Sequence, residues 1–316
     1  MYRYLAFLLT AVVIATGCTD NRPQQDVAAL VARVEQARLS DHIVALLKQG
    51  PRTRTNVAAM QHSVAYISSQ LTQYGYRPYT ETLAAGGVNI LAERRGTGTP
   101  RRVLELAAHY DTRADTPGAD DNASGVAALL EVARLLAQAQ PHYTVRFCFF
   151  DHEEDGLAGS RHHVQLIRAR NEPLLGAIVL EMVGYATEQP RSQGTPLRVP
   201  LLFSPPTTGN FIAVAGNIPS GGLGNRFERA ADVYVPALPY FSANRLAGFL
   251  KDALRSDHSA YWDSGYRAIM LTDTADFRNP HYHQPSDTLE TLNLAFLQNV
   301  TRAVLASLLV DGVASR

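Results

Sequence analysis

Apolar residues recur along the chain with two different spacings, and each spacing predicts a different element. In the window 56–74 they return every three or four positions, which predicts an amphipathic helix. The windows 27–39 and 41–48 repeat this spacing. Residues 76–82 and 88–94 instead have the composition of strands, and the two glycines between them are typical of a hairpin turn. We therefore expect helices followed by a β-hairpin in the first part of the chain.

The next part of the chain alternates buried strands with amphipathic helices. Nearly continuous apolar runs at 103–108, 144–150 and 177–182 predict strands that are covered on both faces. Helical spacing fills the intervals, over 122–140 and 159–170. This alternation predicts an α/β fold, with a single-domain three-layer αβα architecture around a mixed, largely parallel sheet. Right-handed crossovers then place the carboxyl ends of the parallel strands, and their loops, along one edge.

The pattern weakens between residues 184 and 247, where proline and glycine are frequent. We interpret this segment, 184–247, as excursions over the edge at which the parallel strands end. Within it we expect a strand at 201–203 and a helix at 210–215. Strand composition returns at 268–272, and this last strand should complete the sheet.

A long amphipathic helix is predicted to close the chain over 288–309. Asp287 stands at its N-cap position and Glu290 follows three residues later, which is the spacing of a capping box. The sequence shows no internal repeat and no long low-complexity run. We therefore predict one globular domain over 41–316, preceded at 18–40 by a tether and an N-terminal helix.

Composition bounds the function without defining it. The 316 residues are 46% apolar, which is enough for a sizeable core. Lysine plus arginine and aspartate plus glutamate number 29 each, so no basic excess favours nucleic acid as a partner. Cys18 and Cys148 are the only cysteines, so no disulfide framework is expected. Cys148 lies in an apolar strand and is predicted to be a buried, unreactive thiol.

The first residues have the features of an export signal. A short positive region precedes an apolar run, 4–15, that is too short to span a bilayer as a helix. Small residues then precede Cys18, which resembles the bacterial lipobox. We expect residues 1–17 to be a signal peptide cut before a lipidated Cys18; the alternative is an ordinary secretory signal. In either case the protein is expected to be exported, and the lipoprotein reading places it in the bacterial cell envelope. Thr19 favours an outer-membrane lipoprotein that faces the periplasm and meets the membrane only through its lipid anchor.

Side chains that bind metals lie where the predicted strands end. Two imidazoles and four carboxylates follow successive strands, and such a set can hold two divalent cations and still leave a general base. In isolation each residue has a simpler explanation, as a lone histidine at a strand end, a helix-capping aspartate or a solvated glutamate. The set consists of His109, Asp121, Glu153, Glu154, Glu181 and His283.

Local geometry indicates roles for some residues and leaves others open. Asp111 lies two residues after His109 and shares its face on an extended backbone, so it can accept a hydrogen bond from the ring nitrogen that does not bind metal. Asp120 and Asp121 are adjacent, and geometry alone does not decide which of them would bridge two cations. The paired glutamates point in different directions, so one can bind metal while the other serves as general base.

Five motifs, taken in order, resemble the zinc aminopeptidase family M28. The resemblance covers the chain from about Leu71 to the C-terminus and implies the zinc-dependent exopeptidase fold. The motifs are His-x-Asp at 109–111, Gly-Ala-Asp-Asp-Asn-Ala-Ser-Gly at 118–125, Glu-Glu-x-Gly-Leu-x-Gly-Ser at 153–160, Leu-Glu-Met-Val-Gly at 180–184 and His-x-x-x-Asp-Thr at 283–288.

The resemblance implies a role for each residue of the set. Glu153 matches the general base, and Asp121 matches the carboxylate that bridges two zinc ions. Glu181 departs from members that have aspartate there, and it keeps the charge while adding a methylene. The ligands of one zinc match His109 and Glu181, and those of the other match Glu154 and His283.

Residues around the set match supporting positions. Tyr282 matches a position that in some members offers a hydroxyl to the oxyanion. Asp257 and His258 belong to a Ser-Asp-His element, and His258 is expected to be a buried hydrogen-bonding support, not a ligand. Asp287 can cap the last helix, orient a ligand, or both. His152 is expected to pack behind the ligands. A surface or loop position is expected for His162, His163 and His281.

The resemblance implies an exported aminopeptidase that hydrolyses the N-terminal bond of peptides with a free amino terminus. It would use two zinc ions, Zn2+, with Glu153 moving the proton of the attacking water. One alternative is a glutaminyl cyclase, which shares this fold but uses a single zinc. Another is a metal-free binding ectodomain that keeps only the fold. The complete ligand set favours the peptidase, and the sequence does not specify an oligomeric state.

Overall fold

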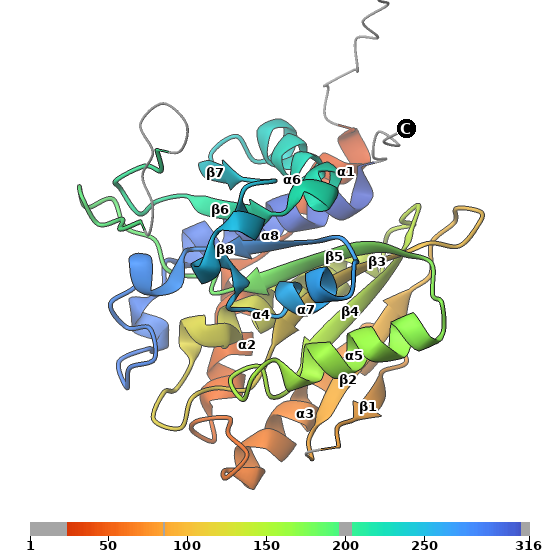
Figure 1. The fold of residues 1–316 in the computed structure, drawn as a ribbon, viewed down its shortest axis with the longest axis horizontal. Coiled ribbons are helices and arrows are strands. Elements are labelled where there is room, and N and C mark those ends of the chain that lie inside the picture. Colours follow the sequence, from red (N-terminus) through yellow and green to blue (C-terminus); the bar gives the residue numbers. More distant parts are fainter. Residues whose placement is uncertain (1–23, 85, 196–203, 311–316) are drawn as a thin grey trace, which may run out of the picture.

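The computed structural model describes residues 24–84, 86–195 and 204–310. Its strands are β1 (Tyr79–Thr82), β2 (Val88–Arg94), β3 (Val103–His109), β4 (Thr144–Phe150), β5 (Leu174–Glu181), β6 (Ile212–Gly216), β7 (Tyr240–Ala243) and β8 (Ala268–Thr272). Within these described ranges the strands form one sheet in the order β1-β2-β4-β3-β5-β8-β6-β7, with helices on both faces (Figure 1). The predicted three-layer α/β architecture is confirmed.

Helices cover the two faces of the sheet unequally. α5 (Ala158–Ala169) and the short α7 (His258–Asp263) cover one face, where they pack on each other and on β2, β5 and β8. The opposite face carries a thicker layer, whose helices pack on one another around α8. They are α1 (Gln25–Val31), α2 (Gln36–Leu47), α3 (Val57–Gln73), α4 (Gly125–Leu136), α6 (Gly221–Tyr234) and α8 (Leu294–Leu309).

The middle of the sheet is parallel and its margins are mixed. β4, β3, β5 and β8 run in one direction, whereas β2 is antiparallel to β4 and β6 is antiparallel to β8. The predicted glycine turn joins β1 to β2 as an antiparallel hairpin, and both Gly86 and Gly87 adopt positive φ. The parallel strands therefore end along one edge, which lies at the left of Figure 1.

Alternation along the strands separates an apolar core from a more polar one. Leu104 and Leu106 of β3 belong to the large apolar core under α4 and α8. Ala107 faces the smaller core under α5 and α7, and the period of two places Glu105 and His109 on that same face. The α5/α7 face therefore carries polar groups from the middle of the sheet to the edge where the strands end.

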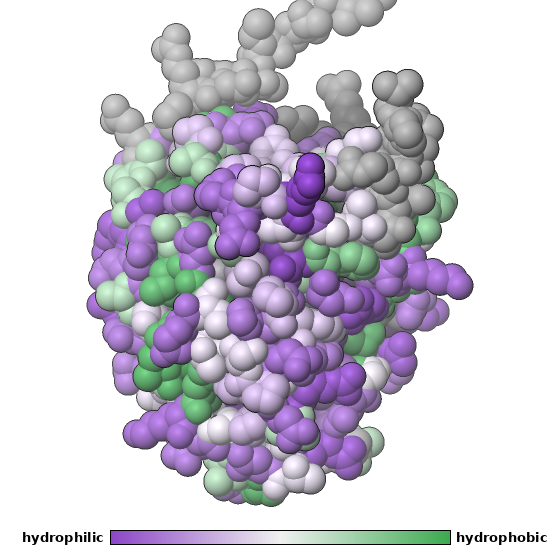
Figure 2. All heavy atoms as spheres, turned by 90° about the vertical axis from the view of Figure 1, so that its left-hand side faces the viewer, coloured by the Kyte–Doolittle hydropathy of each residue, from purple (hydrophilic) through white to green (hydrophobic). Residues whose placement is uncertain are grey.

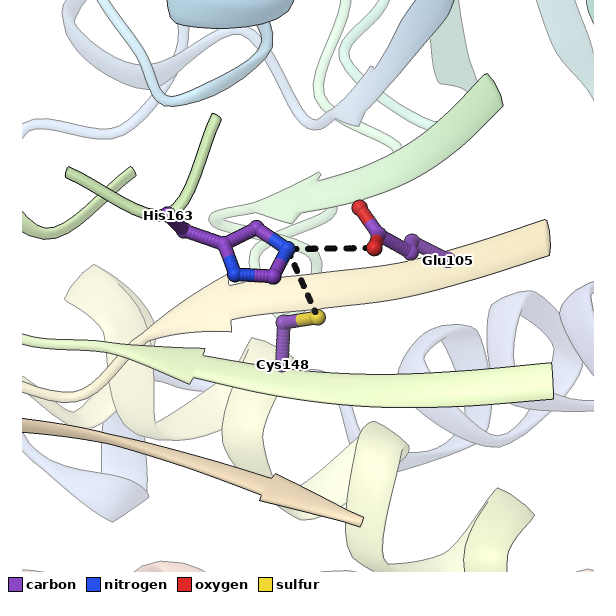
Figure 3. A group of neighbouring side chains, drawn as sticks. All are labelled: Glu105, Cys148 and His163. Atoms are coloured by element: carbon purple, nitrogen blue, oxygen red, sulfur yellow. Dashed lines mark hydrogen bonds and ion pairs between the residues drawn. The ribbon is translucent and has the colours of Figure 1, made fainter. Parts of the chain in front are cut away.

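A buried ionic network lies on this second face (Figure 3). His163 of α5 lies 3.0 Å from a carboxylate oxygen of Glu81 and 3.0 Å from one of Glu105. One ring nitrogen points toward both Glu105 and Cys148 (Figure 3). Arg146 also contacts Glu105, at 2.8 Å. Burial opposes protonation of His163, but the Glu105 carboxylate outweighs it and holds the histidine pKa well above its ordinary value.

The structure of this network contradicts the prediction made for His163 and confirms the one made for Cys148. The expected surface or loop position of His163 was wrong, because its side chain is 1% exposed. The two carboxylates that contact it come from strands far away in the sequence, so its burial could not be predicted from its neighbours along the chain. Cys148 is buried as predicted, and burial raises the pKa of its thiol to about 12. Glu105 is already bound by Arg146 and by the Tyr261 hydroxyl, so we interpret the cluster as an ion-pair network.

The segment 184–247 is more regular than predicted. The expected helix at 210–215 was wrong, because residues 212–216 form β6, a fully buried strand between β8 and β7. A short apolar run such as Ile-Ala-Val-Ala-Gly has no resolvable period, so helix and strand could not be distinguished there. With α6 and β7, the second half of this segment extends the sheet instead of lying over its edge. The strand expected at 201–203 lies outside the described residues.

Several helix ends differ from the predictions. The closing helix begins at Leu294, where the side chain of Asn293 accepts a hydrogen bond from the main chain of Phe296. Asp287 does not cap it, because it binds elsewhere, and the predicted capping box was wrong. The predicted helix 27–39 is divided between α1 and α2.

The described helices give no membrane-spanning candidate. None of the helices in the described ranges is long and apolar enough to cross a bilayer. The predicted signal peptide, 1–17, and the predicted lipidation site, Cys18, lie outside the described residues. Their assignment therefore stays a prediction from the sequence.

Arg146 and Arg101 provide a matched test of the buried network, because both contact Glu93. Arg146 is buried and lies 2.7 Å from Glu93, whereas the Arg101 side chain is 50% exposed. Arg146→Met should lower the free energy of unfolding by about 3–5 kcal/mol, since it leaves buried carboxylates unpaired. Arg101→Met should change it by about 0–1 kcal/mol. Urea unfolding of both variants measures the difference, and equal effects would contradict a structural role for the network.

Candidate metal centre

Two groups of metal-binding atoms lie side by side at the edge where the parallel strands end. Asp121 links the groups, because its Oδ1 lies 3.4 Å from His109 Nε2 and its Oδ2 lies 3.0 Å from His283 Nε2. Within each group, one ligand atom per residue lies within 4.8 Å of the others. The structure thus brings together all the residues of the predicted set. The two groups are His109, Glu153 and Glu181, and Asp121, Glu154 and His283.

His109 and Glu181 are neighbours because their strands pair in register. Ala107 of β3 lies opposite Val179 of β5. Two residues further along each strand the side chains share a face again, so His109 and Glu181 end these strands together. His109 Nε2 lies 3.3 Å from Glu181 Oε2, and the Ser256 hydroxyl donates a 2.6 Å hydrogen bond to the same oxygen. The longer side chain of Glu181 therefore reaches the histidine and a supporting donor at once.

A tight turn positions Asp121 ahead of α4. The turn covers residues 119–124, and its Asp121–Asn122 peptide bond is cis. The Asp287 carboxylate accepts hydrogen bonds from the main-chain nitrogens of Asp120, at 2.8 Å, and Asp121, at 3.1 Å. The Asn122 side chain ties the turn to the main chain at the end of β5, with bonds of 2.8 and 3.1 Å. Asp287 thus supports this turn and does not cap a helix.

Asp120 points away from the two groups and joins neighbouring loops. Its carboxylate accepts hydrogen bonds from the Gly184 N–H, at 2.8 Å, and from the Asn279 amide, at 2.7 Å. Only Asp121, of the two adjacent aspartates, therefore faces both histidines. The fully buried Arg52 fixes the loop before the turn, because it donates to three of its carbonyl oxygens at 2.6–2.8 Å.

Asp111 holds the main chain of the turn that carries Glu153 and Glu154. Its carboxylate accepts hydrogen bonds from the main-chain nitrogens of Glu153, at 3.0 Å, and Glu154, at 3.2 Å. The predicted contact with His109 is present but weaker than expected. His109 Nδ1 lies 3.5 Å from the Asp111 carboxylate and 3.2 Å from its carbonyl oxygen. Asp111 therefore orients the histidine mainly through its main chain and the glutamates through its side chain.

His283 and Tyr282 come from the loop that follows β8. Their rings stack, with centroids 3.7 Å apart. The Tyr282 hydroxyl accepts a 3.0 Å hydrogen bond from Arg255, whose guanidinium also pairs with Asp276 at 3.0 Å. A hydroxyl that accepts from a guanidinium keeps its own hydrogen available for another acceptor. Tyr282 also lines the cavity over the site, so that hydrogen can be offered to a ligand.

Carboxylates outnumber positive groups in this centre, and the pKa values reflect the imbalance. Burial raises the pKa of Glu153 well above its ordinary value, and the Glu181 carboxylate raises it further. Burial opposes protonation of His109, but the same carboxylates outweigh it and hold its pKa well above the usual value. The pKa of His283 is raised to about 9, because two carboxylate contacts outweigh burial. Divalent cations would neutralise this cluster in place of protons.

The donor set fits zinc. Imidazole nitrogens and carboxylate oxygens are ordinary zinc ligands, and each group supplies both. Glu154 Oε1 is buried and has no hydrogen-bond partner in the described part of the chain. It lies 3.3 Å from His283 Nε2. A buried carboxylate oxygen without a donor is unfavourable unless a cation binds it, so the residues fit two divalent cations with Asp121 between them.

The remaining residues predicted around the site lie behind it. Asp257 and His258 are fully buried. Burial raises the pKa of Asp257 to about 7 and lowers that of His258 to about 4. His258 lies 2.6 Å from the carbonyl oxygen of Ala253, as expected of a buried support. His152 is also buried, and it contacts Asp155 at 3.0 Å.

A cavity of about 590 Å³ opens over the two groups. Its floor includes ligand residues of both groups, and side chains of β6, β7 and β8 supply an apolar wall. Figure 2 looks onto this side of the molecule, where hydrophilic residues cover most of the surface between smaller hydrophobic patches. The arrangement combines an acidic centre with room for an organic substrate.

A family model described as peptidase family M28 matches residues 89–308. The chain belongs to peptidase family M28. The match runs from β2 to α8 and contains both ligand groups. The family resemblance read from the five motifs is thereby confirmed.

Relatives of this M28 protein include bacterial and fungal proteins. The uncharacterized protein YfbL of Escherichia coli is 35% identical over 275 residues, which cover 82% of each chain. A probable zinc metalloprotease of Leptosphaeria maculans is 24% identical over 342 residues, covering 92% of this chain and 78% of the relative.

Solved structures share the fold at low identity. The Legionella pneumophila LapA aminopeptidase has a TM-score of 0.71 and 18% identity, covering 96% of this chain and 78% of its own. A glutaminyl cyclase of Bacteroides thetaiotaomicron has a TM-score of 0.62 and 19% identity, covering 88% and 98%. At this identity the likeness establishes the fold alone, so side chains have to decide the chemistry.

Several residues that shape this M28 site could not be recognised from the sequence. Arg52 and Asn279 carried no local signal, because their partners lie in loops far along the chain. Ser256 was noticed only as part of the Ser-Asp-His element, yet it binds Glu181 directly. Arg255 gave no sign of its contact with Tyr282. A buried arginine or asparagine can be inferred from sequence only when its partners are already known.

Asp287 and Glu290 test the structure against the capping box that the sequence suggested. Asp287→Ala should weaken zinc binding by about 10–100-fold, because the turn that carries Asp121 loses both of its carboxylate contacts. Glu290→Ala should leave zinc affinity unchanged, since Glu290 is not in the centre. Competition with a chromophoric chelator measures the zinc affinity of each variant, and circular dichroism verifies that each variant is folded. Similar zinc affinities in the two variants would exclude the proposed support.

Proposed function

We propose that this M28 protein is an aminopeptidase that releases N-terminal residues from peptides with the help of two zinc ions. One observation carries the proposal: each carboxylate oxygen of Asp121 faces a different histidine, and each histidine belongs to a separate ligand group. The likeness to LapA aminopeptidase and to a probable zinc metalloprotease supports the class of reaction and the metal.

Glu153 is the proposed general base. Zinc, when bound, polarises a carbonyl group and acidifies water. Glu153 takes the proton of the attacking water and delivers it to the leaving amine, which is the transfer that a carboxylate positioned beside the reacting water performs. The Tyr282 hydroxyl, whose hydrogen is free, donates to the carbonyl oxygen as negative charge develops there.

The surplus of carboxylates would restrict cleavage to the N-terminal peptide bond of a substrate. A free α-amino group is an ammonium cation at neutral pH, and it is attracted to Glu181 and its neighbours. An internal peptide bond has no such charge nearby and gains nothing from the acidic site. Peptides with a blocked amino terminus should therefore be poor substrates.

Glu153 and Glu154 should fail in different ways when each is changed to glutamine. Glu153→Gln should keep its zinc but lower kcat by about 10²–10⁴-fold, because only the proton carrier is lost. Glu154→Gln should lose zinc, because it removes a ligand charge. Hydrolysis of leucine p-nitroanilide and metal analysis by mass spectrometry give the two readouts. Glu188→Gln, at an exposed position away from the ligands, is the control. Near-native turnover of Glu153→Gln would count against this mechanism.

His109→Ala tests the number of metals. The protein should contain two zinc ions per chain and the variant about one, because only the group built on His109 and Glu181 loses a ligand. Equilibrium dialysis followed by metal analysis measures the count. Two ions retained in the variant, or one ion in the unaltered protein, would contradict a two-zinc centre.

A glutaminyl cyclase shares this fold, so the reaction itself has to be tested. A cyclase would convert an N-terminal glutamine peptide to its pyroglutamyl form, with loss of ammonia. The proposed peptidase would release free glutamine instead. Mass spectrometry of the products separates the two reactions, and a cyclised product would replace the peptidase assignment.

We also propose that the protein is exported and anchored in the bacterial envelope by a lipid on Cys18. The support is the sequence of residues 1–18 alone. Cell fractionation of the full-length protein and of Cys18→Ala tests it. Equal recovery in the membrane fraction would exclude the lipid anchor.

A further inference from the structure

The strand order divides the cavity into zones of different chemistry. The acidic centre lies where β3 and β5 end. On the side of β8, β6 and β7 the cavity is lined by apolar groups, among them Ala213, Ala243 and Met270. On the opposite side, the loop after β3 and the first turns of α5 contribute Arg113 and Arg161. Because the sheet order is β4-β3-β5-β8-β6-β7, the apolar and basic zones flank the acidic centre.

The two arginines are available for a ligand. Arg161 lines the cavity, and its guanidinium has no hydrogen bond or ion pair among the residues that the structure describes. The Arg113 side chain is 54% exposed, and its contact is Glu154, at 3.2 Å. That contact joins the Nε of Arg113 to Oε2 of Glu154, whereas the oxygen open to a cation is Oε1, so the terminal guanidinium nitrogens of Arg113 are left for a ligand. A pair of guanidinium groups on one wall is suited to a carboxylate.

The basic zone faces the half of the substrate that leaves. Glu153, which protonates the leaving amine in the proposed function, stands in the β4–α5 connection, and this connection leads into the first turn of α5 that carries Arg161. An ammonium would be repelled by the arginines, so the amino end of the substrate turns toward Glu181 and the apolar zone. A peptide bound with its amino end there would continue past Glu153 toward Arg113 and Arg161, which also line the cavity.

We propose that Arg113 and Arg161 bind a carboxylate on the residue that follows the cleaved bond, so that dipeptides with a free carboxyl terminus are the preferred substrates. The side chain of aspartate or glutamate at the second position offers the same chemistry. This inference rests on the aminopeptidase function proposed above, and it adds the class of substrate. The apolar zone receives the side chain of the first residue.

The experiment compares kcat/KM for Leu-Gly, Leu-Gly-amide and Leu-Asp-amide. The unaltered protein should favour Leu-Gly over Leu-Gly-amide by about 10–100-fold, the usual worth of charge-assisted hydrogen bonds. A high rate on Leu-Asp-amide assigns the arginines to acidic side chains as well. Arg161→Gln should lower the ratio of Leu-Gly to Leu-Gly-amide at least about 5-fold, and Arg161→Lys should restore part of it because the charge returns.

Arg54→Gln is the matched control, because Arg54 is an exposed arginine near the site that pairs with Asp155 at 3.7 Å and does not line the cavity. It should keep the original ratio. The ratio is measured within each variant, so a general loss of activity does not affect it. Equal rates on Leu-Gly and Leu-Gly-amide, alongside hydrolysis of leucine p-nitroanilide, would overturn the inference and leave the peptidase intact. No hydrolysis of any of these substrates by the zinc-loaded protein would overturn both.

Discussion

Negative charge concentrated in a buried space is the constraint on which the site depends. Four carboxylates and two imidazoles converge where β3, β4 and β5 end; His109, Asp121 and Glu153 are buried, and the other three residues are partly exposed. Such a cluster is stable only when cations or protons neutralise it. The raised pKa values of His109 and Glu153 express this requirement. In the proposed function the same field would attract the substrate ammonium, so the stability of the centre and its proposed chemistry would have one electrostatic origin.

The ligand loops are held by contacts to their main chain. Asp287 holds the Asp121 turn, and Asp111 holds the turn that carries the two glutamates. Non-glycine residues with positive φ stand next to the ligands in these loops: φ is 57° at His152, 52° at Met182 and 55° at His283 itself. Each such residue costs about 1–3 kcal/mol, so the network of side chains to main chain is what keeps the ligands in place.

The fold leaves the reaction open, since an aminopeptidase and a glutaminyl cyclase both resemble it. The features that favour an aminopeptidase over a glutaminyl cyclase are the two candidate ligand groups joined by Asp121 and the apolar and basic zones of the cavity around them. The parallel centre of the sheet aligns the ligands, whereas the strands beyond β5 supply apolar surface and the β4 side supplies positive charge. In the proposed function, substrate choice would thus depend on parts of the chain outside the motifs.

The pattern of residues along the chain was enough to predict the strands of the parallel centre and to select the residues of the candidate metal centre. Continuous apolar runs identify β3, β4 and β5 because strands buried on both faces need no alternation, and the motifs mark residues whose chemistry is local. Long-range contacts, in contrast, determine that residues 212–216 form a strand, that Asp287 supports Asp121 and that His163 lies between Glu81 and Glu105. Those outcomes depend on partners far along the chain, and local periodicity contains no information about contacts that only folding creates.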